Sequence, residues 1–308
     1  MLGSPPVNRL QANLCLLCVT LCWSSEVILF SCIPAGVPAF ATTCVTAFAG
    51  AALLAVPFRR RVAAALRGGG WRLVLFGIVL AALNSTYNTL YLVGMKSFDV
   101  ASGAFTFSMT VVVLPVVLLT MRRHVERGTW LAVVLVTAGI VLALGPTLRP
   151  VHAPGLAVVA IGCLLRAVHI VILADLVKKH DPLAVAVLLQ AFAGAIALGG
   201  WALEDPRLFA GLPLSRPLVA TWALYAYFVV AFAQTLNVTA MRRVTAANAT
   251  VVYSVEIIFS LAWGVLLPPG IVERIALSPR IVVGALLVVG GSLAEILDLG
   301  GKRKEVLP

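Results

Sequence analysis

The sequence predicts an all-α integral membrane protein in which ten transmembrane helices form two inverted five-helix repeats. The first observation is composition: of 308 residues, 61% are hydrophobic and only 11% are charged, whereas an average soluble domain is about 25% charged. The mean hydropathy is +1.04. The second observation is that apolar residues form continuous runs of the length, about 20, that crosses about 30 Å of hydrocarbon as a helix. The third is an internal repeat, described below.

The expected helices follow one another with short breaks that carry Pro, Gly and basic clusters. Such breaks are typical of places where a chain leaves the hydrocarbon. Continuous apolar runs exclude a β-barrel, whose strands are about ten residues long and alternate in polarity. We expect helices at 10–33, 37–57, 71–94, 98–121, 129–147, 154–177, 182–203, 217–240, 246–267 and 280–298.

The basic residues predict the orientation, because Lys and Arg in short loops remain on the cytoplasmic side. When the connections are assigned alternately, 16 of the 23 Lys and Arg residues fall on one side and 6 on the other, with Arg166 inside a helix. We therefore expect a cell (inner) membrane protein with both termini in the cytoplasm, including a basic tail at 299–308. Topology and anionic lipid headgroups explain the net charge of +11, and no nucleic-acid partner is expected.

The chain repeats itself after nearly half its length. The phrase AFAGAALL at 47–54 returns as AFAGAIAL at 191–198, and a shift of 144 aligns 22–54 with 166–198 without a gap. A shift of 146 places Asn88 on Gln234. The units are 10–147 and 154–298, each with five expected helices. Because five is odd, the second unit enters the membrane from the opposite side, and inverted repeats are typical of alternating-access carriers with a substrate site near the midplane. We expect the repeated phrase to be helix-contact surface.

Short motifs occur at corresponding places in both halves. They are Trp23-Ser24-Ser25 followed by an apolar run with Pro34 and Pro38, Gly94-Met95-Lys96 with Val100-Ala101-Ser102, Ala240-Met241-Arg242-Arg243-Val244 with Ala246-Ala247-Asn248, and Glu256 within SVEIIF. With these motifs, residues 10–298 resemble the EamA-like branch of the drug/metabolite transporter superfamily. The resemblance implies ten helices in two inverted repeats and export of amino acids or other small metabolites, often by proton exchange.

The chain departs from that family pattern at three places. The Pro that usually follows the ninth-helix Glu is Ile257, and the Asn expected in the first helix is Glu26. The Gly-Glu that commonly follows the ninth helix is missing from LLPPGIVERI. These departures bear on the substrate more than on the fold.

Three charged residues fall well inside the expected helices: Arg166 and Glu256 near the centres of theirs, and Glu26 four residues outward of the centre of the first. A charge at the centre of a membrane helix costs about 2.5 to 3.5 kcal/mol on insertion scales, so such residues face the protein interior and usually serve a function. One interpretation is a structural ion pair between Arg166 and either Glu. The other is that a poorly hydrated carboxyl group exchanges a proton while Arg166 binds a substrate carboxylate. With two acids and one base, the second acid stays available for a proton or an ammonium group.

Polar and aromatic residues at helical spacing predict further substrate contacts. The candidates are Asn84, Asn88 and Tyr91 in 71–94, Gln234 and Asn237 in 217–240, Tyr253, Ser260 and Trp263 in 246–267, and Trp23 in 10–33. The amides could equally serve as helix-to-helix hydrogen bonds. His169, one turn after Arg166, is a candidate proton relay or a histidine bonded to a backbone carbonyl.

Other function classes lack their motifs. Cys15, Cys18 and Cys22 form a stripe on the first helix, but a CxxC without a His or a second pair lacks the zinc-site pattern, so we expect no metal and no cofactor. No GxxxxGK[ST] motif is present, and His124, His152 and His180 stand apart in connections, so an integral-membrane lipid enzyme is a remote alternative.

We therefore expect a secondary active exporter of a small polar metabolite, an amino acid or related zwitterion, with protons and membrane lipid as partners and a monomer or homodimer as its assembly. The alternative is efflux of lipophilic or quaternary cations, because Glu26 resembles the first-helix Glu of small multidrug resistance proteins. In that case Trp23, Tyr253 and Trp263 would supply aromatic faces for a cation. Arg166 argues against this alternative, since a cation in the membrane repels a cationic substrate.

Overall fold

A computed structural model describes residues 8–34, 36–95, 109–144, 153–268 and 278–297, and over these residues every regular element is helical. The first half of the chain, residues 8–144, contains α1 (Arg9–Ser24), α2 (Glu26–Ser31), α3 (Ala39–Ala55), α4 (Arg59–Met95), α6 (Thr110–Thr120) and α7 (Arg127–Leu144). The second half, residues 153–297, contains α8 (Ala153–Lys179), α9 (Pro182–Glu204), η2 (Leu208–Gly211), α10 (Arg216–Leu224), η3 (Tyr225–Phe232), α11 (Ala233–Ala240), α12 (Ala246–Tyr253), α13 (Glu256–Leu266) and α14 (Pro279–Ile296).

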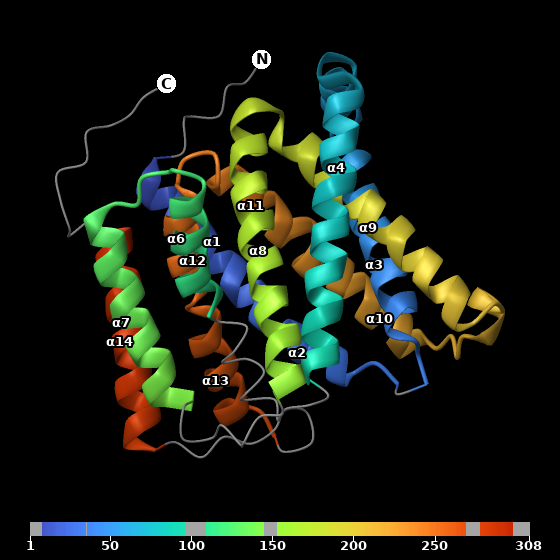
Figure 1. Ribbon diagram of the computed structural model, residues 1–308. Helices are drawn as coiled ribbons and strands as arrows, with labels where there is room; N and C mark the ends of the chain where they lie inside the picture. The colour runs from blue at the N-terminus through green and yellow to red at the C-terminus, as the bar shows by residue number, and fades with distance from the viewer. Residues whose placement is uncertain (1–7, 35, 96–108, 145–152, 269–277, 298–308) are drawn as a thin grey trace.

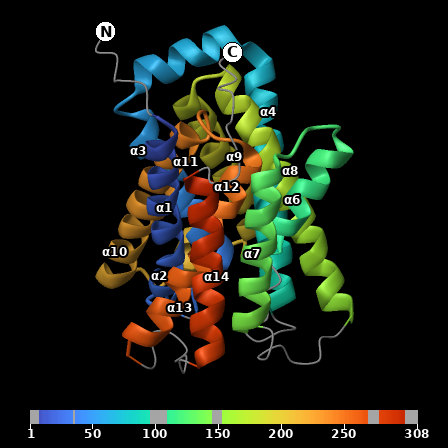
Figure 2. The same ribbon diagram turned by 90° about the vertical axis from the view of Figure 1, so that its left-hand side faces the viewer.

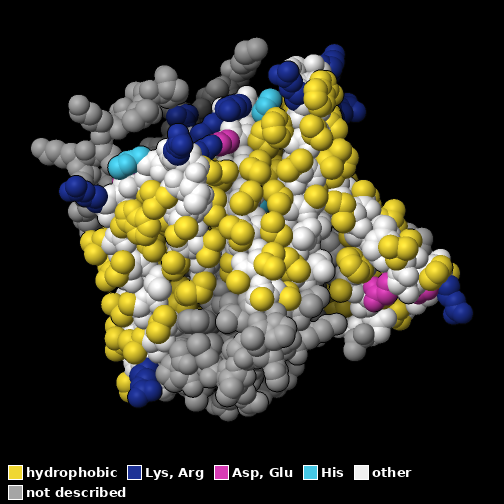
Figure 3. Space-filling view, viewed as in Figure 1, with side chains coloured by type: hydrophobic (Ala, Val, Ile, Leu, Met, Phe, Trp, Pro, Cys, Tyr) yellow, Lys and Arg dark blue, Asp and Glu magenta, His cyan; other side chains and the backbone are white. Residues whose placement is uncertain are grey.

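Six helical stretches are long and apolar enough to cross a membrane. They are Arg59–Leu90, Ala157–Lys179, Pro182–Glu204, Arg216–Ala240, Ala246–Leu266 and Pro279–Ile296. Three shorter apolar helices, Ala39–Ala55, Thr110–Thr120 and Arg127–Ala143, lie among them. Apolar side chains are spread over the length of the coloured helices in Figure 3, and most of the Lys and Arg side chains in this view lie near the upper end. This distribution is that of a membrane protein, as the composition predicts.

Two of the expected helices are interrupted at a serine. The first run divides at Ser25 into α1 and α2, and the ninth divides after Ser254 into α12 and α13. The hydroxyl of Ser25 donates to the carbonyl of Cys22 (2.6 Å), and that of Ser254 donates to the carbonyl of Thr250 (3.2 Å). Such side-chain bonds to a preceding carbonyl bend helices. Neither break contains Gly or Pro. The ninth run still forms one stretch long enough to cross a membrane, Ala246–Leu266, whereas the first run, expected as a helix at 10–33, is divided into two shorter helices.

The third irregular stretch is η3, a π-helix of eight residues between α10 and α11. It lies inside the expected run 217–240. In addition, the connection expected at 58–70 is helical, because α4 begins at Arg59 and changes direction at Gly70, where φ is 55° and ψ is −155°. The part before Gly70 lies across one end of the bundle in Figure 2. A positive φ of this kind favours glycine.

The helices of the two halves interleave (Figure 1). Helix α7 packs on α14, α3 packs on α9, and α4 packs on both α8 and α9. In the same way α1 packs on α11, α12 and α13, and α6 packs on α8. The main apolar core draws fully buried side chains from six of these helices, namely Leu16, Leu80, Leu114, Leu173, Leu189 and Val252. The halves therefore share one core.

Glycines permit the closest of these contacts. A methyl group on Gly139 of α7 would lie 2.5 Å from the carbonyl oxygen of Gly284 in α14, and the reverse substitution would meet the oxygen of Gly139 at 2.5 Å. A methyl group on Gly194 would lie 3.0 Å from Phe48. Phe48 and Gly194 belong to the two copies of the repeated phrase. The copies pack against each other, which agrees with the expected role of that phrase as contact surface.

Ion pairs gather at the upper end of the bundle in Figure 1, where α1, α4 and α9 begin and α8 and α14 end; we call it the basic end. Arg9 lies 3.6 Å from Glu295, Arg61 lies 2.5 Å from Asp181, and Arg123 binds Asp175 through two hydrogen bonds of 2.8 and 2.5 Å. In each pair the arginine comes from the first half and the acid from the second. Hydrogen bonding to Asp175 raises the pKa of Arg123 above its ordinary value.

Candidate functional site

Arg166 and Glu256 form the centre of the candidate site. Arg166 lies in α8, and its Nη2 is 3.9 Å from Oε2 of Glu256, the first residue of α13. Their side chains are 13% and 32% exposed. Lys179 and Ala246 lie at the basic end. At a rise of about 1.5 Å per residue along the helix, Arg166 is about 20 Å from Lys179, and Glu256 is about 15 Å from Ala246. The pair is therefore deep in the apolar part of the bundle.

Glu26 reaches the same region from the first half of the chain. It is the first residue of α2, after the break at Ser25, and about 25 Å from Arg9 along the helix. The hydroxyl of Tyr225, the first residue of η3, donates a hydrogen bond to Oε1 of Glu26. The charges of Arg166 and Glu256 both act on Glu26. All three predicted ionisable residues thus belong to one cluster.

An aromatic pair and two amides extend the cluster through α1, α11 and α12. The rings of Trp23 and Tyr253 are 5.3 Å apart at an angle of 50°. The hydroxyl of Tyr253 donates to Oδ1 of Asn237, and Nδ2 of Asn237 donates to Oε1 of Gln234 over 3.5 Å. Tyr253, Gln234 and Asn237 are buried. The charge of Arg166 acts on Tyr253, so these predicted site residues lie together.

Tyr87 of α4 borders the cluster on another side. Its hydroxyl donates to Oδ1 of Asn84 (2.7 Å) and also shares a hydrogen bond with Asn88. The edge of its ring meets His169, with centroids 5.5 Å apart and 61° between the planes. The charge of Arg166 acts on both Tyr87 and His169. The predicted amides of α4 therefore reach the cluster through Tyr87.

His169 is 5% exposed. Over the residues that the structure describes, its Nε2 is buried without a hydrogen-bond partner. This nitrogen therefore shows no bond to a backbone carbonyl. The proton-relay interpretation stays a prediction.

Of the remaining predicted residues, two lie at the edge of the cluster and one has a side chain outside the described residues. Trp263 of α13 donates its indole N–H to the hydroxyl of Ser24 (3.0 Å), next to Trp23. The side chain of Tyr91 lies outside the described residues. Asn88 is exposed in spite of its bond to Tyr87. Asn88 and Trp263 thus mark the margin of the cluster.

The sequence interpretation missed Tyr87 and Tyr225. Tyr87 lies between Asn84 and Asn88 in the same helical stripe, so helical spacing alone could have found it. Tyr225 could not have been found in this way. It precedes Gln234 by nine residues, about two and a half turns of an α-helix, which places it on the opposite face. The π-helical turns of η3 change that phase and bring Tyr225 to Glu26.

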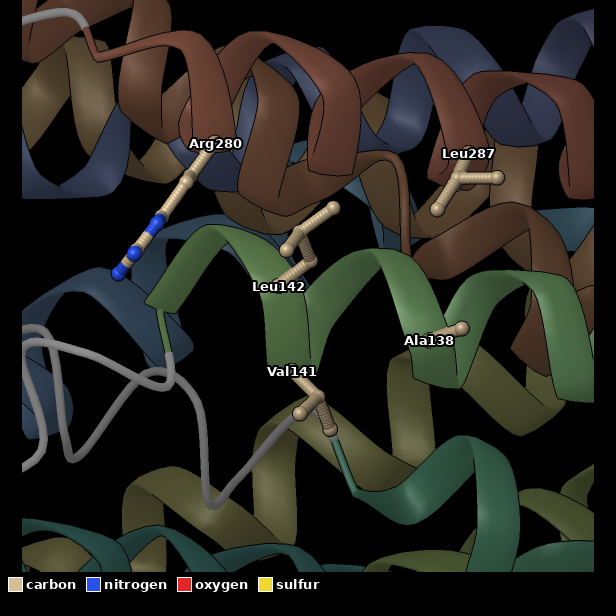
Figure 4. A pocket seen from close by; sticks show the side chains of 5 residues that line it. All are labelled: Ala138, Val141, Leu142, Arg280 and Leu287. Carbon is tan, nitrogen blue, oxygen red and sulfur yellow. The ribbon is translucent and has the colours of Figure 1, made fainter.

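The cluster brings together two carboxyl groups, a guanidinium group, two amides and an aromatic pair. Among the described residues, no three His, Cys, Asp or Glu side chains lie close enough together to hold a metal ion. A depression of about 430 Å³ lies elsewhere, between α7 and α14, lined by Ala138, Val141, Leu142, Leu287 and Arg280. Figure 4 shows the guanidinium of Arg280 at one end of this mostly apolar lining. We use the name central cluster for Glu26, Arg166 and Glu256 with Trp23, Tyr87, His169, Tyr225, Gln234, Asn237 and Tyr253. The depression includes none of these residues.

Comparison with known proteins identifies the fold only. No protein-family model matches the chain, and no curated protein matches it. Chains of solved structures do match, 29 in number. One of them, described only as the crystal structure of a protein, superposes with a TM-score of 0.75 at 19% identity, and the match covers 94% of this chain and 97% of that one. At this identity the similarity shows a shared fold.

Proposed function

We propose that the chain is a secondary active transporter that exports an amino acid or related zwitterion in exchange for protons. One observation carries this proposal. Glu26 and Glu256 each begin a short helix directly after a break, and both lie within electrostatic reach of Arg166. Discontinuous membrane helices that present charged residues near the midplane are typical of substrate and coupling-ion sites in secondary transporters.

The helix contacts support ten spans arranged as two inverted repeats. In chain order, α1 corresponds to α8, α3 to α9, α4 to α10–α11, α6 to α12–α13, and α7 to α14. When each helix is replaced by its counterpart, the contact of α4 with α8 becomes that of α11 with α1, and the contact of α6 with α8 becomes that of α12 and α13 with α1; all of these contacts are present. The same replacement leaves the contacts of α3 with α9 and of α7 with α14 unchanged. Such pairing is expected if 10–147 and 154–298 are related units. Alternating access follows naturally, because two related halves can exchange conformations around a shared site.

Each charged group has a role in this proposal. Arg166 binds the substrate carboxylate, because a guanidinium offers paired donors that match a carboxylate. The separation of 3.9 Å from Glu256 leaves that acid as a countercharge that a substrate carboxylate can replace. One acid then holds the substrate ammonium or a proton. Trp23 and Tyr253 contribute aromatic surface for the substrate side chain.

One observation favours the second candidate, efflux of lipophilic cations. The ring of Tyr253 pairs with that of Trp23 and lies within electrostatic reach of Glu256, and aromatic faces attract organic cations. Arg166 opposes this assignment, since its positive charge acts on both acids and on Tyr253 and would repel a cationic substrate. In either case we propose an inner membrane location with the basic end in the cytoplasm, which follows from the distribution of Lys and Arg. The enzyme alternative has no support in the cluster, and it stays untested.

The proposal is tested by transport in proteoliposomes. Purified protein is first screened by thermal shift against amino acids, nucleosides and cationic dyes at two pH values. The ligand found is then followed across the membrane with and without a pH gradient. We expect substrate movement to be driven by the gradient and to carry protons in the opposite direction. Glu26→Gln and Glu256→Gln should each change the rate or its pH dependence.

Asp175→Asn provides the matched control, because Asp175 pairs with Arg123 at the basic end and lies outside the cluster. This variant should transport like the wild type. The proposal is wrong if Gln at both acids leaves the rate and its pH dependence unchanged. Turnover of a lipid in detergent, without any gradient, would instead support an enzyme.

A further inference from the structure

The hydrogen bond between Tyr225 and Glu26 joins the two halves of the chain at the central cluster. Glu26 belongs to α2 in the first half and Tyr225 to η3 in the second. Both residues sit where the helix is irregular, Glu26 after the break at Ser25 and Tyr225 at the start of the π-helix. π-Helical turns are rare and frequently occur at functional sites. The contact therefore combines two irregular segments with one buried acid.

The two tyrosines of the π-helix, Tyr225 and Tyr227, lie in different environments. Tyr225 is turned toward α2, where its hydroxyl meets Glu26. Tyr227, two residues later, is 52% exposed, and its ring packs on that of Phe228 at a centroid distance of 4.9 Å. The same segment thus presents one phenol to the cluster and another to the surroundings of the bundle. This difference supplies a matched pair of residues for experiment.

The groups around Glu26 are of three kinds. The Tyr225 hydroxyl donates a hydrogen bond to it, the charge of Arg166 attracts it, and the charge of Glu256 repels it. Tyr87 also lies within electrostatic reach, from α4. Arg166 makes an ionic contact of 3.9 Å with Glu256, whereas Glu26 accepts a hydrogen bond from the Tyr225 hydroxyl. The two acids therefore have different direct partners.

We infer that Tyr225 is a positioning residue that holds Glu26 for proton exchange and leaves the Arg166–Glu256 pair for the substrate. This inference rests on the proposed function and divides its two tasks between the acids. A hydrogen bond donated to a carboxylate favours the charged form. Protonation of Glu26 weakens that bond and loosens the contact between α2 and η3. Proton binding is thereby linked to the interface of the two halves.

The experiment compares Tyr225→Phe with Tyr227→Phe. Each loses one hydroxyl from the same π-helix, but only Tyr225 contacts Glu26. Transport by each variant is measured in proteoliposomes from pH 5 to pH 9, with KM and maximal rate determined at each pH. We expect Tyr225→Phe to move the pH midpoint of transport upward by about one unit, because the lost hydrogen bond favours the charged carboxylate. A hydrogen bond to a charged group contributes about 1.5 kcal/mol, which corresponds to about one pKa unit. The KM for substrate should change less than about twofold, and Tyr227→Phe should match the wild type.

A second variant tests the division of tasks and covers the case that Tyr225→Phe does not fold. Gln at position 26 still accepts a hydrogen bond from the Tyr225 hydroxyl, so Glu26→Gln retains the contact. We expect its transport to lose pH dependence while KM stays within about twofold. An increase in KM of tenfold or more would show that Glu26 binds substrate and would overturn the inference.

The outcomes distinguish the inference from the proposed function. If the wild type transports with a pH midpoint and both Tyr→Phe variants share it, the inference is wrong and the carrier stands. If the wild type shows no gradient-driven transport, the proposed function itself is wrong. If Glu26→Gln instead keeps a pH midpoint and Tyr225→Phe moves it in that background, the phenol acts through another group, and the inference is again wrong.

Discussion

The basic end and the central cluster use the same residue types in different geometries. At the basic end, Arg61 and Arg123 approach their acids to 2.5 Å. In the central cluster, Arg166 and Glu256 are 3.9 Å apart. Each basic-end pair joins the first half of the chain to the second, whereas Arg166 and Glu256 both belong to the second half. The two close pairs, Arg61–Asp181 and Arg123–Asp175, hold the halves together, whereas the longer Arg166–Glu256 separation lies within one half.

The ion pairs of the basic end also differ in how exposed their side chains are. The side chains of Arg123 and Asp175 are 44% and 35% exposed, but that of Glu295 is 1% exposed. Glu295 accepts a hydrogen bond from Nδ2 of Asn248 (3.1 Å) and lies beside Arg9. A buried charge depends on its partners far more than an exposed one does. Removing a charge from the central cluster should therefore affect transport, whereas removing one from the basic end should affect stability.

The largest expected effect is on transport, from Arg166→Ala. Truncating one partner of a buried, hydrogen-bonded charge pair costs about 2–5 kcal/mol, much of it from the charge left behind. We expect the affinity for carboxylate-bearing substrates to fall at least about 30-fold, while organic cations gain access. Competition binding with an amino acid and a cationic dye measures both changes. Arg123→Ala, at the basic end, should leave both affinities unchanged, and an equal loss in the two variants would contradict the assignment.

The next largest effect is on stability, from Glu295→Ala. Removing the acid takes the shared partner from Asn248, which is fully buried, and from Arg9, whose side chain is 30% exposed. We expect a loss of about 1–3 kcal/mol, the usual cost of leaving a buried polar group without its partner. Thermal unfolding in detergent measures it, with Glu295→Gln, which keeps the volume and an acceptor, as the intermediate case. Equal stability of Glu295→Ala and wild type would show that the buried contact does not hold the basic end together.

Much of the central cluster could be predicted from the sequence, because charged residues are costly in a bilayer and are therefore rare in long apolar runs. Glu26, Arg166 and Glu256 stand out in apolar runs, and the structure brings them together. The aromatic and amide residues at helical spacing, such as Tyr253 and Asn237, joined them because regular helices preserve spacing. The helical class and the apolar runs were predicted for the same reason.

The irregular features were not accessible in this way. The breaks at Ser25 and Ser254 lie in apolar sequence without Gly or Pro, and at each the serine hydroxyl bonds to a carbonyl of the preceding turn. Tyr225 depends on a π-helix that changes the helical phase. Glu295 lies near the end of its run, where an acid can reach water, so its burial depends on coverage by neighbouring helices. These features arise from tertiary contacts, which a one-dimensional pattern does not contain.

The smallest expected effect concerns the exposed pair of Arg123 and Asp175. Exposed ion pairs contribute about 0–1 kcal/mol, and salt screens them. Asp175→Asn should therefore lower the free energy of unfolding by no more than about 1 kcal/mol at low salt, and by less at about 1 M salt. The charge exchange of Arg123→Asp with Asp175→Arg should recover most of that loss, because both positions have access to water. A loss as large as that of Glu295→Ala would mean that the two-bond geometry, rather than burial, determines how much a basic-end pair stabilises the bundle.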